Sequence, residues 1–177
     1  SRDWSSDVCS SDLLDEPALA VAIRISPDRV IVGGLAHALA AAATHWGANG
    51  LRCARLAIGI ASHTPVMAEA VEVFKMRLAS VGLNSAQTLI ACNFTGTCSR
   101  DPALLAQALA GQMASTVRWD DCMDSIAERQ PDCVLEVGPG GGLSAMWRER
   151  YPAIPARSIE EFNGPQGVIE WLLKQSD

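Results

Sequence analysis

A histidine in the stretch GIASHTPVM, residues 59–67, is the first candidate for chemistry in this chain of 177 residues. His63 follows an apolar run that we interpret as a strand, and it precedes a helix start at Thr64 and Pro65. In α/β sheets, ligands and catalytic groups collect at the carboxyl ends of the strands, where His63 would lie. The positive end of the following helix favours a neutral imidazole, so His63 is a candidate base. A capping or core histidine without chemistry would fit the same place.

Two amide side chains lie in apolar surroundings. Asn93 is near the end of the apolar run TLIACNF, residues 88–94, and Gln112 occupies a helix face where Leu or Met would be usual. We therefore expect Gln112 to be buried, and a buried amide needs hydrogen-bond partners. Either each amide satisfies a nearby loop, or the two loops hold the imidazole in place. The face of Gln112 also carries Leu105, Leu109 and Met113.

The first elements that would position these residues form a small unit. The patterns predict two strands joined by a turn at Pro27, then an Ala-rich helix, then a third strand before His63. This order, ββαβ, closes an α+β unit that looks incomplete at its front. The expected ranges are 18–26, 28–34, 35–50 and 51–61.

After His63, helices and strands alternate. Pro65 and Gly82 bound the first helix, and Asp101 with Pro102 starts the second. Alternation of this kind implies a parallel sheet with helices on its faces. The later expected helices are 119–129, 143–151 and 165–175, and the expected strands are 88–94, 133–137 and 156–159.

Composition excludes several classes. Hydrophobic residues make up 49% and charged residues 19% of the chain, as in globular proteins. The net charge of −6 argues against a nucleic-acid partner. No apolar run reaches the roughly 18 residues of a membrane span, and no signal peptide is visible. Six cysteines without a C-x-x-C pair are typical of reduced thiols in a cytoplasmic protein.

The opening segment, SRDWSSDVCSSDL, stands apart. Residues 1–13 have no regular period and a Ser/Asp bias, and they resemble a translated sequencing adaptor. We expect this segment to be non-native, so it carries no information on the fold. On that interpretation, the protein continues upstream and the chain is a fragment.

Three segments in order carry a family resemblance. ASHTPVM, ACNFTG and the long stretch LAGQMASTVRWDDCMDSIAERQPDCVLEVGPGGGLSAM resemble the carboxyl-terminal half of the malonyl-CoA:acyl-carrier-protein transacylases. That family includes the acyltransferase domains of polyketide synthases. The resemblance covers about residues 20–150, and the interval from His63 to Gln112 matches that of the family. The tail, residues 155–172, is similar to the epsilon-type subunits of malonate decarboxylase.

The resemblance implies a fold and an activity. The fold would be α/β: the carboxyl-terminal half of an α/β-hydrolase-like acyltransferase core, residues 58–177, plus part of an inserted ferredoxin-like subdomain, residues 14–57. The activity would move a malonyl or related group from coenzyme A to an acyl carrier protein through an acyl-serine intermediate. Malonyl-CoA would be the substrate and the carrier protein the partner, with no permanently bound cofactor and no metal.

The resemblance also assigns roles to residues. His63 matches the catalytic histidine, a general base that activates a serine and later protonates the leaving thiol. Gln112 matches the glutamine whose segment supports that histidine through a backbone carbonyl. Asn93 matches an asparagine beside the histidine.

Departures from the family pattern matter equally. The family's nucleophile lies on a G-x-S-x-G elbow, and no such motif occurs here. The arginine that pairs with the malonyl carboxylate and an early glutamine motif also have no match in residues 14–177. We therefore expect the chain as given to be inactive. IASH, residues 60–63, shares its last three residues with the methylmalonyl-type YASH, which leaves the acyl group open.

Two other functions fit parts of the sequence. In LEVGPGGG, Glu136 and three alternating glycines resemble an S-adenosylmethionine loop, with Glu160 available for the ribose, although such loops usually open a fold. The plainer interpretation is a tight strand-to-helix turn packed close to its neighbours. A non-catalytic fragment could instead dock an acidic carrier protein through arginines, unless these form only a solvated face. The arginines are Arg148, Arg150 and Arg157.

Overall fold

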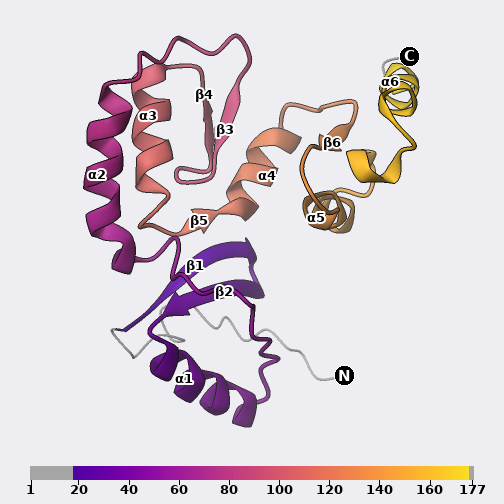
Figure 1. Ribbon diagram of the computed structural model, residues 1–177. Helices are drawn as coiled ribbons and strands as arrows, with labels where there is room; N and C mark the ends of the chain where they lie inside the picture. Colours follow the sequence, from indigo (N-terminus) through magenta and orange to yellow (C-terminus); the bar gives the residue numbers. More distant parts are fainter. Residues whose placement is uncertain (1–17, 176–177) are drawn as a thin grey trace. The chain divides into compact units, whose positions relative to one another are not determined.

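The computed structural model describes residues 18–175 and has an α/β architecture (Figure 1). The expected non-native segment, residues 1–13, lies outside the described residues. The chain divides into two compact units, one ending at Cys122 and one beginning at Met123. Helix α4 begins in the first unit and ends in the second.

The first unit opens with the predicted hairpin and helix. Strands β1 and β2 pair antiparallel, and the Ser26 hydroxyl donates to the Asp28 carboxylate at 2.6 Å across the turn. β1 also pairs in parallel with the short strand β5, giving the order β2-β1-β5. The bounds are Leu19–Ser26 for β1, Arg29–Gly34 for β2, Ala36–Ala48 for α1 and Val117–Arg118 for β5.

The expected strand over residues 51–61 is absent. Residues 51–59 have no regular structure and are exposed, and Ile58 and Ile60 leave 67% and 63% of their surface accessible. No described strand lies beside this segment, so its backbone groups have no ladder partner, and a strand is defined by that pairing. The ββαβ unit therefore lacks its last strand among the described residues.

The rest of the first unit is a pair of helices with a hairpin. In Figure 1, α2 and α3 lie side by side, with β3 and β4 next to α3. The Asp101 side chain accepts hydrogen bonds from the N–H groups of Ala103 and Leu104, which confirms the predicted helix start. The bounds are Pro65–Met67 for the 3-10 turn η1, Ala68–Ala79 for α2, Ile90–Cys92 for β3, Thr97–Ser99 for β4 and Pro102–Gly111 for α3.

The β3–β4 hairpin was not expected. Its turn needs Gly96, which has φ +72°, and a Cβ there would lie 2.5 Å from the Cβ of Asp121. The predicted strand over 88–94 is therefore shorter than expected, because the chain reverses after Cys92 and pairs with itself.

Every element predicted from residue 119 onward is present, and each of its ends lies within two residues of expectation. Strands β6 and β7 pair in parallel, with α5 between them in the chain. The bounds are Trp119–Ala127 for α4, Val134–Glu136 for β6, Gly142–Arg150 for α5, Ala156–Ser158 for β7, Ile159–Glu161 for the 3-10 turn η2 and Pro165–Leu173 for α6.

The expectation of one parallel sheet covered by helices is wrong for the described residues. Their strands form three separate sheets, β2-β1-β5, β3-β4 and β6-β7, and only β1–β5 and β6–β7 pair in parallel. A strand of two or three residues forms few backbone hydrogen bonds with a neighbouring strand, and those of β3 are formed with β4. In the part of the chain that the structure describes, no helix is long and apolar enough to cross a membrane.

Candidate functional site

His63 is fastened twice to the turn that follows α3. Its backbone N–H donates to the carbonyl of Met113 at 2.9 Å, and its ring Nδ1 lies 2.6 Å from the carbonyl oxygen of Gln112. A carbonyl can only accept, so Nδ1 carries the proton. In the neutral ring the lone pair then sits on Nε2, which has no hydrogen bond to any described residue. We call this arrangement the His63 clamp.

The backbone at His63 is unusual. Its φ of +63° is left-handed, and among the described residues other than glycine only Gln130 shares that sign. Such a conformation costs free energy and persists where the surroundings impose it, often at functional sites. Thr64, only 1% exposed, anchors the turn by donating from its hydroxyl to the carbonyl of Ala61 at 2.7 Å.

The predicted helix start beside His63 is partly wrong. Pro65 does occupy the first helical position, but Thr64 caps nothing with its side chain, because its hydroxyl is used by Ala61. The helix also opens with a 3-10 turn before α2 begins.

Gln112 contacts His63 through its backbone. The side chain is half-buried, and its amide donates to the carbonyl of Leu109 at 3.3 Å. The expectation of a buried amide is therefore only half met. The face that it shares is not the core face of α3, since Leu109 is 42% exposed while Ala108 and Ala110 are buried.

Asn93 lies in the turn of the β3–β4 hairpin and is not joined to His63 by a hydrogen bond. Its carbonyl accepts from the N–H of Arg118 at 2.7 Å. Its side chain makes no hydrogen bond to a described residue. The structure therefore brings together two of the three residues singled out from the sequence, His63 and Gln112.

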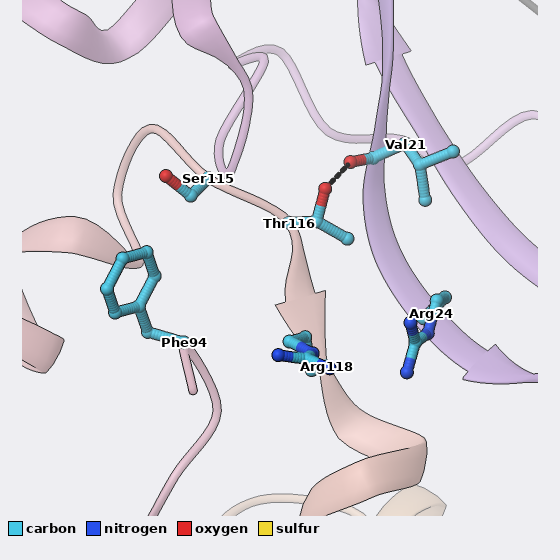
Figure 2. A pocket seen from close by; sticks show the side chains of 6 residues that line it. All are labelled: Val21, Arg24, Phe94, Ser115, Thr116 and Arg118. Carbon is cyan, nitrogen blue, oxygen red and sulfur yellow. Dashed lines mark hydrogen bonds between the residues drawn. The ribbon is translucent and has the colours of Figure 1, made fainter. Parts of the chain in front are cut away.

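A cavity of about 360 Å³ lies in the same unit (Figure 2). Two arginines on its wall are already paired. Arg24 bonds both Asp120 and Asp121, at 2.8 and 2.6 Å, and Arg118 contacts Asp121 at 2.7 Å. The cluster offers no net positive charge to an anionic substrate. The lining residues are Val21, Arg24, Phe94, Ser115, Thr116 and Arg118.

Sequence reasoning did not find this charge cluster. Its signal was present: Arg24 is a charge within an apolar strand, and Asp120 and Asp121 form an acidic pair at a helix start. The hydrogen bond to Asp120, opposed by partial burial, raises the pKa of Arg24. The cluster therefore fastens β1 to the first turn of α4.

The glycine loop after β6, residues 137–142, is filled by its own chain. The Glu136 carboxylate accepts from the N–H groups of Leu143 and Ser144 at 3.1 and 2.7 Å. Burial opposes these bonds, but they prevail and hold the pKa of Glu136 below its ordinary value. The acidic residue that a ribose would need therefore faces the start of α5 instead.

The glycines of that loop serve the backbone and are not closely packed. Gly138 and Gly140 have φ of +150° and +91°, yet a Cβ on either would meet nothing within 4 Å. The expectation of a turn packed close to its neighbours is wrong at these positions. The turn itself is present, because Ser158 donates to the carbonyl of Gly140 at 2.6 Å and holds it.

The arginines considered for docking a carrier protein are all paired. Arg148 and Arg157 bond Glu161 at 3.2 and 3.1 Å, and Arg150 bonds Asp124 at 2.6 Å. Within residues 18–175, no group of three or more His, Cys, Asp or Glu side chains could hold a metal ion.

Comparison with known proteins identifies a family for the chain. The family described as acyl transferase domain matches residues 5–158, a range that begins inside the opening segment. The malonyl CoA-acyl carrier protein transacylase of Salmonella typhimurium is 26% identical over 137 residues, which cover 77% of this chain and 44% of the relative. The chain spans about half the length of the curated relatives that it matches first.

Solved structures share the fold. The malonyl-CoA:acyl carrier protein transacylase of Xanthomonas oryzae superposes with a TM-score of 0.79 at 25% identity, over 88% of this chain and 49% of that one. A malonyl-transacylase solved in complex with a type II polyketide synthase acyl carrier protein gives a TM-score of 0.77 at 23% identity, over 85% and 48% of the two chains.

Proposed function

We propose, from the premise that this chain belongs to the acyl transferase domain family, that it supplies the catalytic base of an acyltransferase. The enzyme would move a malonyl or related acyl group from coenzyme A to an acyl carrier protein. The Salmonella relative is named for this reaction, and a similar structure was solved with a carrier protein. No permanent cofactor is needed, because the thioester is itself activated.

One observation carries the proposal: the Nδ1 of His63 is 2.6 Å from the carbonyl of Gln112. This bond fixes the tautomer, so Nε2 is the basic atom. Nε2 would take the proton of a serine hydroxyl as the serine oxygen attacks the thioester carbonyl, and would return it to the departing thiolate. In the second half, Nε2 would deprotonate the carrier's thiol, whose sulfur takes the acyl group while the serine oxygen regains a proton.

The nucleophile must come from elsewhere. The printed sequence has no G-x-S-x-G elbow, and acyl transfer by this route needs one. We therefore propose that the chain acts as the carboxyl-terminal part of a longer enzyme, with residues 58–177 in a hydrolase-like core. Residues 14–57 would belong to a ferredoxin-like subdomain, a division supported by the β1–β2 hairpin and α1.

The pathway is a finer part of the proposal. The names of the relatives support fatty acid or polyketide synthesis. The tail over residues 155–172 resembles the epsilon-type subunits of malonate decarboxylase, which makes that branch a further candidate. We expect a cytoplasmic enzyme in each case. The methyltransferase and docking alternatives are not proposed. Glu136 is bound to the start of α5, and Arg148, Arg150 and Arg157 are paired with carboxylates.

A complementation experiment tests the function. The purified chain is incubated with malonyl-CoA, alone and together with the amino-terminal half of the Salmonella transacylase, and each protein is weighed by mass spectrometry. We expect no adduct on the chain alone, and a malonyl adduct on the serine of the added half. A stoichiometric adduct on this chain by itself would contradict the proposal, as would a complementing pair that never acylates although both halves bind each other.

A further inference from the structure

The ring of Phe94 is in unusually close contact with Gly111. Gly111 immediately precedes Gln112, whose carbonyl is hydrogen-bonded to the ring of His63. A Cβ on Gly111 would lie 2.9 Å from ring atoms Cε1 and Cζ of Phe94 and 3.1 Å from Cε2. Cβ atoms essentially never approach other heavy atoms that closely, so only glycine lets the ring lie there. Gly111 does not have a positive φ, so space and not conformation requires a glycine.

Backbone hydrogen bonds also fix the main chain on either side of Phe94. The preceding residue, Asn93, accepts a hydrogen bond from the N–H of Arg118 at 2.7 Å, and the N–H of Gly96 donates to the carbonyl of Cys92 at 2.8 Å. These two bonds tie the hairpin turn to β5 and to β3. The ring of Phe94 therefore packs against α3 from a turn that can move only if these backbone hydrogen bonds break.

We infer that the contact of Phe94 with Gly111 is a positioning device for the imidazole of His63. The ring fixes where α3 ends, the end of α3 places the carbonyl of Gln112, and that carbonyl sets the tautomer and orientation of the ring of His63. Asn93 contributes through its backbone, which places Phe94. The catalytic consequence rests on the proposed function, whereas the geometric link stands without it.

The cavity beside Phe94 allows a different response to a larger residue at position 111. Phe94 also lines the open space of about 360 Å³ in Figure 2. A larger residue at position 111 could therefore push the ring into that space and leave the Gln112 carbonyl in place. The test must distinguish a displaced ring from a displaced carbonyl.

Histidine-selective ¹⁵N labelling of the full chain reads the carbonyl directly, because only His37, His45 and His63 contribute signals. The measured quantity is the exchange rate of the His63 Nδ1 proton with water. In Gly111→Ala we expect exchange to become about three- to tenfold faster, the scale of one weakened hydrogen bond. Gly47→Ala is the matched control, since a Cβ there meets nothing within 4 Å, and it should leave the rate unchanged.

A second pair of variants makes the link to the ring explicit. Phe94→Leu should also speed the exchange, because it removes ring atoms that bear on Gly111, and it serves alone if Gly111→Ala does not fold. Adding Gly111→Ala to Phe94→Leu should cause a smaller change than adding it to the wild type. A folded Gly111→Ala with wild-type exchange would overturn the inference, as would a wild-type rate in Phe94→Leu.

The same samples separate this inference from the proposed function. If the exchange responds as expected but the complemented protein never acylates its serine, the function fails and the positioning role stands. If acylation proceeds and the exchange ignores both residues, the positioning role fails alone.

Discussion

The His63 clamp and the glycine loop after β6 both place a polar side chain before a helix, but they use it in opposite ways. In the clamp, one ring nitrogen of His63 is bound and the other is left with its lone pair. Just before the loop, both carboxylate oxygens of Glu136 accept hydrogen bonds from N–H groups at the start of α5. Chemistry is available only where the fold leaves an atom unbound.

The backbones of the two regions differ in the same sense. His63 has φ +63° with a side chain attached, whereas the loop reaches φ +91° at Gly140, where no side chain resists. The first conformation is costly and the second is cheap. We expect such a cost to be tolerated where the residue type cannot be exchanged, and the difference therefore favours the clamp as the candidate functional region.

The sharpest way to break the comparison is to remove each side chain from the complemented acyltransferase. His63→Ala should lower the rate of acyl transfer by about 10²–10⁴-fold, the scale of a positioned base. Glu136→Ala, in the same assay under stable conditions, should leave the rate within a few-fold of wild type. His37→Ala is the control for loss of a histidine, since His37 is exposed on α1. Wild-type turnover in His63→Ala would remove the role assigned to the clamp.

Removing the carboxylate before the glycine loop should have a smaller effect, and on stability. Glu136→Ala should lower the free energy of unfolding by about 1–2 kcal/mol, because two N–H groups of α5 lose their acceptor. Urea titration measures the loss. Glu160→Ala removes the same charge at an exposed position and should change little.

The pH dependence of that loss has a definite sign. Folding holds the pKa of Glu136 below its ordinary 4.5, so the stabilisation is fully present above pH 4.5. It declines as the pH falls through the folded-state value. The wild-type advantage over Glu136→Ala should therefore shrink in acid. A difference that grows below pH 4.5 would show that the carboxylate is not what stabilises the loop.

The smallest expected effect concerns the glycines. Gly140→Ala should cost about 1 kcal/mol in thermal or urea unfolding, because alanine resists a φ of +91°. Gly142→Ala, in helix α5 and equally free of neighbours, should cost nothing beyond about 0.5 kcal/mol. Equal losses in the two variants would mean that space, not conformation, selects these glycines.

Local sequence patterns predicted most elements, and tertiary pairing decided the rest. The Asp101 cap and the helix at Pro165 depend on neighbouring residues alone, so they could be read from the sequence. The strand expected over 51–61 could not be checked in this way, because a strand exists only with a partner. The β3–β4 hairpin was missed because its turn depends on Gly96 lying against the distant Asp121.

The candidate site was predictable to a similar degree. His63 and Gln112 were found by residue type, position and family resemblance, and the carbonyl contact between them matches what that resemblance implied. The amide side chain of Gln112 was a misleading signal, because Gln112 contacts His63 through its backbone carbonyl, which a residue of any type has. The contact of Phe94 with Gly111 leaves no periodic signal at all.

The exposed segment without a strand partner, residues 51–59, makes the chain easy to nick. Arg52 and Arg55 lie in it, and trypsin prefers extended, accessible backbone after arginine. A cut there would part α1 from the His63 clamp along the chain. The two pieces would still share the β1–β5 ladder and the bonds from Arg24 to Asp120. Limited digestion should thus yield two bands on a denaturing gel that leave a sizing column as one species.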